Sequence, residues 1–332
     1  MGIDKSGLIE EAIERLSPVE ADCTLCPRTC RVDRRSSASG VCRTGVQARV
    51  SHAILHFGEE PVLSGHEDCS RTVAGDGRET GGSGTIFFGG CNLKCLFCQN
   101  YQLSWLDEGP PVYDSALAAM MLDLQGRGAL NINFVSPTHV VLPILRALRI
   151  AWDQGGISVP LVYNSNGYDS PDVIARLEGI IDIYLPDLKY AFPALSRRYS
   201  GAADYFEKAS GAVREMSVQQ PVLEVDAKGV ARKGLIVRHL VLPGHADDSV
   251  EVLRWIRGHL SPHIGLSLMS QYRPCYKAPK EIRRAVTPEE YRRVADTALE
   301  LGFENLFLQP ESFAPGEHRV PDFEKKEPFD WK

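Results

Sequence analysis

Apolar residues alternate between two spacings along the chain from residue 85 onward. Short runs of consecutive apolar or β-branched residues predict strands, and longer segments with helical spacing predict helices between them. The predicted strands are residues 85–88, 132–135, 160–163, 181–185, 235–242, 264–269 and 305–308. The predicted helices are residues 116–125, 140–153, 171–177, 205–216, 250–260 and 288–302.

This alternation is typical of a parallel sheet, because consecutive parallel strands need crossover connections, which are usually helices. Six strand–helix units predict an α/β fold, an incomplete (β/α)6 barrel of the TIM type rather than an open doubly wound sheet. We expect this barrel to span residues 85–309. In such barrels the active site lies at the carboxyl ends of the strands.

The segments on either side of the predicted barrel lack this alternation. Residues 1–50 contain an amphipathic helix over residues 5–17, followed by a cysteine-rich segment with few apolar residues. Residues 51–84 are rich in glycine and predict a connecting segment of loops, with a short extended piece near residues 53–57. Residues 310–332 carry prolines among charged residues, which predicts an extended tail on the surface.

Composition narrows the class of protein. The 332 residues are 43% hydrophobic and 24% charged, an ordinary globular balance, and the formal net charge is -6. A negative charge argues against nonspecific binding to nucleic acid, where a basic face supplies most of the affinity. No apolar run approaches the roughly 20 residues of a membrane span, and residues 1–21 lack an apolar secretion core. We therefore expect a cytoplasmic protein with neither nucleic-acid nor membrane partners.

Most of the nine cysteines fall into two groups. A reducing cytoplasm disfavours disulfides, so grouped thiols indicate metal binding. Cys69 and Cys275 stand apart, and we expect them to be inert buried thiols. The first group is Cys23, Cys26, Cys30 and Cys42, and the second is Cys91, Cys95 and Cys98.

The second group directly follows the predicted strand 85–88. Three thiolates spaced as Cys91-x3-Cys95-x2-Cys98 on one loop can converge on a single cube of iron and sulfide. A 4Fe–4S cluster usually takes four thiolates, so three leave one iron open for a ligand. The alternatives are three buried small side chains or three zinc ligands. Zinc is less suited, because no histidine lies in or near the loop.

This loop resembles the signature of the radical S-adenosylmethionine superfamily, which has the same cysteine spacing and an aromatic residue, here Phe97, before the last cysteine. The resemblance implies that Cys91, Cys95 and Cys98 bind a 4Fe–4S cluster whose open iron is chelated by S-adenosylmethionine. It implies an oxidoreductase-like enzyme that receives an electron from a flavodoxin- or ferredoxin-like donor. Reductive cleavage of S-adenosylmethionine then gives a 5′-deoxyadenosyl radical that abstracts hydrogen from a substrate.

A closer resemblance is to the pyruvate formate-lyase activating enzyme group, and within it to the activating enzyme-related branch. It extends from the first cysteine group through residues 56–61, 84–91 and 98–100 to residues 271–274. The resemblance leaves three functions open. They are a radical enzyme acting on an unidentified small molecule or peptide, an activase of a glycyl radical enzyme, and a non-catalytic iron–sulfur or electron-transfer protein.

The same resemblance suggests residues that contact the cofactor. Ser136 and Thr138 replace the usual acidic turn after the second strand, and they are equally suited to capping the following helix. Asp187 and Lys189 match an Asp-Leu-Lys segment of activating enzymes, and an ion pair at a strand end is the alternative. The remaining candidates for cofactor binding are Phe97, Asn100, Asn164, Asn166, Arg238 and Gln271.

The four N-terminal cysteines predict a second metal site. Their spacing is x2, x3 and x11, so four thiolates lie within 20 residues. A closed set of four thiolates suits structural zinc, and the same set suits an auxiliary 4Fe–4S cluster. The tight spacing within one loop slightly favours the cluster. Either metal would order this segment, which is poor in apolar residues.

Overall fold

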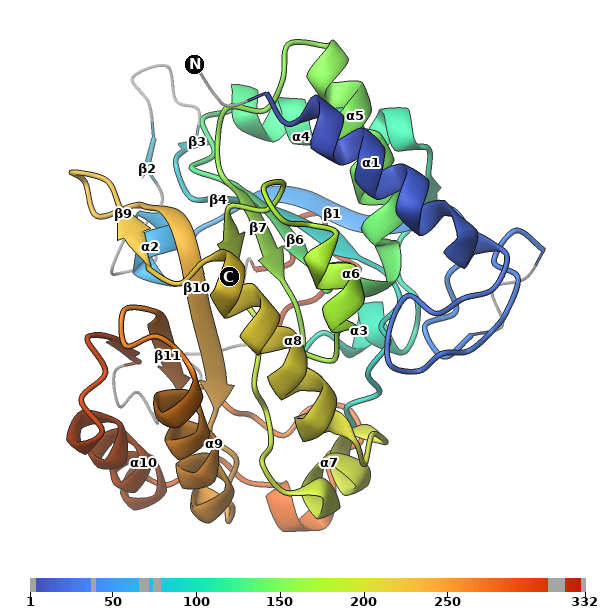
Figure 1. Cartoon of the computed structure of the whole chain (residues 1–332). Helices are drawn as coiled ribbons and strands as arrows, with labels where there is room; N and C mark the ends of the chain where they lie inside the picture. The colour runs from blue at the N-terminus through green and yellow to red at the C-terminus, as the bar shows by residue number, and fades with distance from the viewer. Residues whose placement is uncertain (1–3, 37–39, 66–71, 74–78, 310–319, 330–332) are drawn as a thin grey trace.

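The protein is built on one large mixed β-sheet (Figure 1). The computed structural model describes residues 4–36, 40–65, 72–73, 79–309 and 320–329. The sheet has ten strands in the order β12-β11-β10-β8-β7-β6-β4-β1-β5, with β9 paired to β10. Its strands are β1 (Ala48–His56), β4 (Ser83–Phe88), β5 (Pro111–Val112), β6 (Ile132–Val135), β7 (Leu161–Asn164), β8 (Ile183–Tyr184), β9 (Glu224–Val225), β10 (Ala231–Leu240), β11 (Gly265–Met269) and β12 (Asn305–Leu308). A separate two-stranded sheet pairs β2 (Thr72–Val73) with β3 (Glu79–Thr80).

Seven strands, β4, β6, β7, β8, β10, β11 and β12, are parallel and lie side by side in chain order. β1 pairs antiparallel with β4, and β5 pairs antiparallel with β1, so both extend the β4 side of the sheet. Within the described residues the two outermost strands, β5 and β12, do not pair with each other. The α/β prediction is therefore confirmed as a mixed sheet that is open and not closed on itself.

Helices connect the parallel strands, as predicted. The longer helices are α1 (Ser6–Leu16), α4 (Asp114–Gly126), α5 (Val141–Asp153), α6 (Pro171–Ala175), α7 (Pro193–Ser200), α8 (Tyr205–Gln219), α9 (Ala246–His259) and α10 (Pro288–Glu300). Short turns of helix are α2 (Pro61–Ser64), α3 (Tyr101–Ser104), η1 (Ser17–Glu20), η2 (Pro137–Val140) and η3 (Lys280–Ile282). α1 packs across α5, and α9 lies beside α10 (Figure 1). Within the described chain, none of the helices has the length and apolar character needed to span a membrane.

The two faces of the sheet differ, because successive side chains of a strand point to opposite sides. On the outer face Ile86 and Phe88 of β4 belong to the main apolar core, together with Leu117 and Met121 of α4. On the inner face Phe87 belongs to a separate small cluster. The helices therefore bury the outer face, which leaves the inner face for other segments.

Two segments outside the predicted barrel cover parts of the inner face. Leu63 of α2 packs with inward-facing residues of β7, β8 and β10. Phe323, only 2% exposed, packs against Phe87 with ring centroids 5.2 Å apart, and Phe329 joins the same cluster. The prediction of a purely superficial tail is therefore wrong for residues 320–329, because their aromatic rings are inserted against the sheet. Residues 310–319 and 330–332 lie outside the described residues.

The structure corrects the sequence-based boundaries in two further places. The extended piece expected near residues 53–57 is the end of a nine-residue strand, β1, which crosses the expected boundary at residue 50. Helix α7 was not predicted at all. Its sequence has too few apolar residues for a helical period to be visible, and it is held by contacts described below.

Candidate functional site

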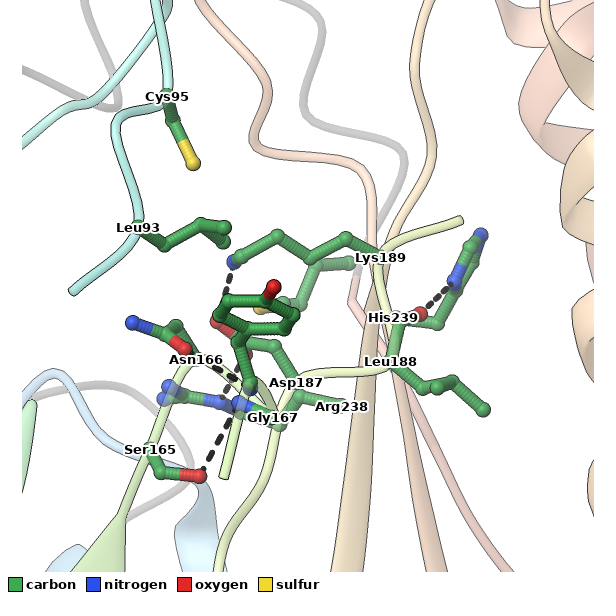
Figure 2. Close-up of polar contacts among 12 residues, drawn as sticks. Leu93, Cys95, Ser165, Asn166, Gly167, Asp187, Leu188, Lys189, Arg238 and His239 are labelled. Atoms are coloured by element: carbon green, nitrogen blue, oxygen red, sulfur yellow. Dashed lines mark hydrogen bonds and ion pairs between the residues drawn. The ribbon is translucent and has the colours of Figure 1, made fainter. Parts of the chain in front are cut away.

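The predicted site residues lie at one edge of the sheet. The cysteine loop follows β4, Asn164 and Asn166 lie at the end of β7, and Asp187 and Lys189 follow β8. These strands are parallel, so their carboxyl ends meet at the same edge. Figure 2 shows the Cys95 side chain pointing toward the Lys189 amine, with Asp187 next to it. The cysteine loop and the segments after β7 and β8 therefore lie together at this edge.

The Cys91 sulfur receives two hydrogen bonds. The Leu93 backbone N–H donates to Sγ at 3.4 Å, and the Asn166 side-chain Nδ2 donates at 3.3 Å. Asn166 was predicted to contact the cofactor; the structure places its amide on a cysteine of the loop. Donors aimed at sulfur stabilise the thiolate, which is the form that binds metal.

The other two loop sulfurs are each contacted by a serine. Ser200 at the end of α7 donates to Cys95 Sγ at 3.1 Å, and Ser104 at the end of α3 donates to Cys98 Sγ at 3.2 Å. Sequence reasoning missed both serines, because a serine in a short helix carries no signal of its own. Each thiol of the loop therefore has a hydrogen-bond donor supplied by the surrounding fold.

Burial disfavours ionisation of the free thiols of Cys95 and Cys98. It raises the pKa of Cys98 to about 12 and also raises the pKa of Cys95, an effect that the Lys189 ammonium opposes. Binding of a metal must therefore release protons, and the positive charge of the metal supplies the missing stabilisation of the thiolates.

A buried ion-pair cluster lies beside the loop. Asp187 contacts Lys189 through one carboxylate oxygen and Arg238 Nε through the other, the latter at 2.9 Å. The three side chains are 14%, 16% and 17% exposed. Burial opposes ionisation of Asp187, but Arg238 and Lys189 outweigh it and hold the pKa of Asp187 below its usual value. The ion pair that the sequence left as the alternative is therefore present, but its charges are largely withdrawn from water and do not lie at the surface.

Two glutamates, Glu59 and Glu60, complete this cluster. Glu59 lies 3.6 Å from Arg238 and accepts a hydrogen bond from Asn133 Nδ2 at 3.2 Å. Burial raises the pKa of both Glu59 and Glu60, although Arg238 opposes the shift. Among the described residues, the buried Glu60 Oε2 and Asn133 Oδ1 have no hydrogen-bond partner. The inner face is thus lined with acceptors that a bound donor would satisfy.

Ser136 and Thr138 do not cap the helical turn that follows β6, which was one of the two roles expected of them. Ser136 adopts a positive φ of 57°. The Thr138 hydroxyl donates to Asp169 Oδ1 at 2.6 Å. Asp169, a buried residue that the sequence analysis missed, also accepts from the Tyr163 hydroxyl and from Ser165. Thr138 is therefore used in shaping the turn after β7, and its hydroxyl proton is committed there.

Two other predicted cofactor contacts are paired with protein groups. Asn164 Oδ1 accepts from Arg238 at 2.6 Å, which ties the end of β7 to β10. The Gln271 amide lies 3.4 Å from Met269 Sδ, and its backbone N–H donates to Gln309 at 3.2 Å. Asn164 therefore orients Arg238, while Gln271 lies at the end of β11, on the edge where it was expected.

The remaining two candidates lie within or beside the cysteine loop. Phe97 is buried and packs edge-on against Tyr199 and Tyr272 at centroid distances of 6.4 and 5.6 Å. Asn100 precedes α3, and its carbonyl accepts hydrogen bonds from two backbone N–H groups of that helix. Both residues therefore shape the loop that presents the thiols.

The four N-terminal cysteines also come together. Cys23, Cys26, Cys30 and Cys42 line one small hollow. Among the described residues, no three His, Cys, Asp or Glu side chains are grouped tightly enough to hold a metal ion, at this hollow or at the loop. Cys275 is buried, as expected of an inert thiol, and Cys69 lies outside the described residues.

Comparisons with solved structures give a distant likeness. Three crystal structures of Streptococcus suis SuiB match this chain. The structure bound to the precursor peptide SuiA matches with a TM-score of 0.48, the structure bound to S-adenosylmethionine with 0.46, and a third structure of SuiB with 0.43. They are 12–13% identical, and the matches cover 66% of this chain. The chain spans about half the length of the SuiB chains it matches, 46–48%. Likenesses of this size do not assign a function.

Sequence comparison gives nearer relatives. No family model matches the chain. Uncharacterized protein MJ0808 of Methanocaldococcus jannaschii is 24% identical over 290 residues, covering 80% of this chain and 74% of the relative. Uncharacterized protein MJ0674 of the same organism is 30% identical over 305 residues, covering 89% and 79%. The chain therefore belongs to the same protein family as MJ0674.

Proposed function

We propose that this protein is a radical S-adenosylmethionine enzyme built on an incomplete barrel, with a 4Fe–4S cluster held by Cys91, Cys95 and Cys98. The observation that carries the proposal is that each of these three thiols has a hydrogen-bond donor. Hydrogen bonds to cluster sulfurs are one of the means by which proteins tune iron–sulfur potentials. Three thiols, each with a donor, therefore supply the ligand chemistry of the group that the sequence predicts.

The charged side chains beside the cysteine loop suit S-adenosylmethionine, the second group that the proposal places here. Lys189 and Arg238 are cations in a largely buried position, which suits the carboxylate of S-adenosylmethionine. Asp187 holds both cations in place and offers an acceptor to an amine or a ribose hydroxyl. When bound, the cluster supplies the electron that breaks a C–S bond of S-adenosylmethionine, giving a radical that takes hydrogen from the substrate.

The packing of the C-terminal segment favours a small molecule or a short peptide as the substrate. Phe323 and Phe329 cover part of the inner face beside β4, and the Phe323 N–H donates to Gln102 Oε1 at 2.9 Å, close to the cysteine loop. An activase of a glycyl radical enzyme needs an open face to admit a loop of its partner. The activase and the kinship with the pyruvate formate-lyase activating group remain alternatives within this proposal.

The proposal is tested by cleavage of S-adenosylmethionine. The protein is purified without oxygen, loaded with iron and sulfide, reduced with dithionite and assayed for 5′-deoxyadenosine. We expect the nucleoside from the wild type and from Cys275→Ala, which alters a buried cysteine outside both groups, and none from Cys95→Ala. A fully loaded wild-type protein that forms no nucleoside would instead favour the non-catalytic electron-transfer function.

A further inference from the structure

The inner face of the sheet carries two hydrogen-bond acceptors that lack a partner in the described part of the chain. Asn133 is fully buried, and its side chain points inward, because its neighbours Ile132 and Phe134 belong to the core on the outer face. Its Nδ2 donates to Glu59 at 3.2 Å, whereas its Oδ1 has no donor. Oε2 of the adjoining Glu60 is buried and unpartnered in the same way. Such atoms are rare in proteins, so two in one cluster point to a ligand that supplies donors.

The segment that carries both glutamates is fixed on the sheet. The Glu60 carbonyl accepts hydrogen bonds from the backbone N–H groups of Leu63 and Ser64, in the turn of α2, at 2.8 and 3.0 Å. The Leu63 carbonyl in turn accepts from Asn131 Nδ2 at 2.9 Å, and the Leu63 side chain packs on the inner face. The Glu60 carboxylate is therefore held at this face before any ligand binds, which lowers the entropic cost of binding one.

The same cluster carries one negative charge more than its cations balance. Its three carboxylates are Glu59, Glu60 and Asp187, and its two cations are Lys189 and Arg238. Arg238 already contacts Asp187 at 2.9 Å and Glu59 at 3.6 Å, and Lys189 contacts Asp187. Burial raises the pKa of Glu60, because its carboxylate is withdrawn from water. A cation bound beside Glu60 supplies the missing charge and favours the ionised carboxylate.

His56, four residues before Glu60, does not supply that cation. Burial lowers the pKa of its ring to about 4, so the ring is neutral at neutral pH. The ring packs against Phe329 of the C-terminal segment with centroids 4.2 Å apart, and against Phe87 at 6.1 Å. The cluster is therefore bordered by uncharged aromatic rings in the direction of His56, which suits the aliphatic part of a ligand.

The two unpartnered acceptors suit a primary ammonium better than other groups. They belong to separate elements, the segment before α2 and the strand β6. An ammonium has three donors around a point charge and can serve acceptors on separate elements. A guanidinium fork instead matches the two oxygens of one carboxylate, and a quaternary ammonium has no N–H to donate. A neutral hydroxyl would leave the surplus charge unbalanced.

Arg238 connects these acceptors with the cysteine loop. Its Nη1 faces Glu59, and its Nε faces Asp187, whose other carboxylate oxygen contacts Lys189. Figure 2 shows Arg238 beside Asp187 and the Lys189 side chain extending toward Cys95. The acceptors therefore adjoin the charged side chains that suit S-adenosylmethionine, as a substrate subsite must.

We propose that Glu60 and Asn133 bind the primary ammonium group of the substrate, which is therefore an aliphatic amine. The ammonium donates to Glu60 Oε2 and Asn133 Oδ1, and Glu59 orients Asn133 through its hydrogen bond to Nδ2. The aliphatic chain extends past Arg238 toward the cysteine loop. The amine is a free small molecule or the lysine side chain of a peptide. That it is a substrate rests on the proposed function; the ammonium site itself does not.

Binding of simple probes tests the site without catalysis. The full-length protein is titrated in a calorimeter with n-butylammonium, n-butyltrimethylammonium, n-butylguanidinium and n-butanol. We expect n-butylammonium to bind about tenfold or more tightly than each of the others, since losing a hydrogen bond to a charged group costs roughly that factor. Equal or tighter binding of any of the other three overturns the proposal. Nα-acetyllysine methylamide then distinguishes the two sources, because it binds more tightly than n-butylammonium only if the site takes the lysine of a peptide.

The variant Glu60→Gln separates binding from a structural role. It keeps the size of the side chain and removes its charge, so we expect n-butylammonium to bind about tenfold or more weakly. Urea unfolding should occur at the same or a higher urea concentration, because a surplus buried charge has been removed. Glu300→Gln, which alters an exposed glutamate at the end of α10, is the matched control and should change neither. Wild-type affinity in Glu60→Gln overturns the proposal, and if this variant fails to fold, the selectivity of the wild type decides.

Competition with S-adenosylmethionine tests whether the site serves the substrate, because S-adenosylmethionine carries a primary ammonium of its own. On protein loaded with iron and sulfide, we expect saturating S-adenosylmethionine to leave the affinity for n-butylammonium unchanged or tighter. Mutual exclusion of the two would assign the acceptors to the cofactor and overturn the proposal. A wild type that binds n-butylammonium but forms no 5′-deoxyadenosine overturns the proposed function alone. One that forms the nucleoside but binds no ammonium overturns this inference alone.

Discussion

At the scale of single residues, the chemistry of the loop depends on side chains that are not ligands. Ser104, Asn166 and Ser200 come from three different elements, and each places a donor on a different cysteine. Ser200 is fully buried and also shares a hydrogen bond with the Tyr190 hydroxyl at 2.8 Å. Its hydroxyl is therefore held in one place by the fold.

We expect Ser200→Ala to lower the reduction potential of the iron–sulfur cluster proposed at the loop. A donor to a cluster thiolate favours the reduced, more negative state, so its removal should lower the potential by roughly tens of millivolts. Redox titration followed by electron paramagnetic resonance measures the shift. Ser196→Ala is the matched control, because Ser196 is also buried in α7 but donates to the Pro193 carbonyl. An unchanged potential in Ser200→Ala, with the cluster intact, contradicts this role.

The grouping of the three loop cysteines was predictable from the sequence, whereas the side chains that donate hydrogen bonds to their sulfurs were not. Three cysteines at fixed spacing after a strand are themselves the signal, whereas Ser200 comes about a hundred residues later in a short polar helix. For Thr138, the position in a motif predicted a cofactor contact. In the structure its hydroxyl donates a hydrogen bond to Asp169, which the motif did not indicate. A hydrogen bond between segments far apart in the sequence produces no periodic pattern of residues from which it could be predicted.

At the scale of elements, the docking of the N-terminal segment on the cysteine loop depends on a glycine. Gly90 has a φ of 87°, and a Cβ there would lie 2.6 Å from the Cys42 carbonyl oxygen and 2.8 Å from Thr44 Oγ1. A side chain is excluded both by the backbone conformation and by the neighbouring segment. The close approach of the two cysteine groups therefore requires glycine at this position.

We expect Gly90→Ala to destabilise the protein by about 2 kcal/mol or more, through strain and steric clash. Urea unfolding followed by circular dichroism measures the change. Gly229→Ala is the matched control, since Gly229 has a similar φ of 76° but nothing within 4 Å of its Cβ position. The difference between the two variants isolates the steric clash with Cys42, Thr44 and His139 from the strain of the backbone conformation. Equal losses of stability would show that the contact is not tight in solution.

The alternation of strands and helices was largely predictable from the sequence, whereas the elements outside the predicted barrel were not. β6 and β12 match their predicted ranges, because short apolar runs between helical segments mark buried parallel strands. β1 was predicted only at its end, since most of its residues are partly exposed and its apolar positions form no continuous run. β1 lies beside β4 because the two strands pair antiparallel, although a long connection separates them. The local pattern of apolar residues does not indicate such a pairing.

At the scale of the whole molecule, the outer face of the sheet is apolar, whereas the inner face carries a charged cluster beside two small apolar clusters. The inner cluster contains three carboxylates, Glu59, Glu60 and Asp187, and two cations, Lys189 and Arg238. Charges withdrawn from water are costly unless they are paired, so a surplus acceptor such as Glu60 is retained at a cost in stability. That cost is expected at a site that binds a ligand carrying donors.

Burial of neutral histidines makes the stability of the whole protein depend on pH. His139 and His239 are 2% and 1% exposed, and burial lowers the pKa of each to about 4. An unfolded histidine titrates near about 6.5, so between these values the unfolded state binds more protons than the folded state. The contribution of both residues is therefore fully present above about pH 6.5 and is lost as the pH falls toward about 4.

We expect the free energy of unfolding to decrease between about pH 7 and about pH 5 by roughly 1–3 kcal/mol for each buried histidine. Urea unfolding at both pH values measures this decrease. The variant His139→Gln keeps a donor for the Gly89 carbonyl, which the ring Nε2 contacts at 2.9 Å, and should make the decrease smaller. His259→Gln, which alters an exposed histidine on α9, should leave it unchanged. A decrease of the same size in wild type and His139→Gln would mean that this ring is solvated in the folded protein.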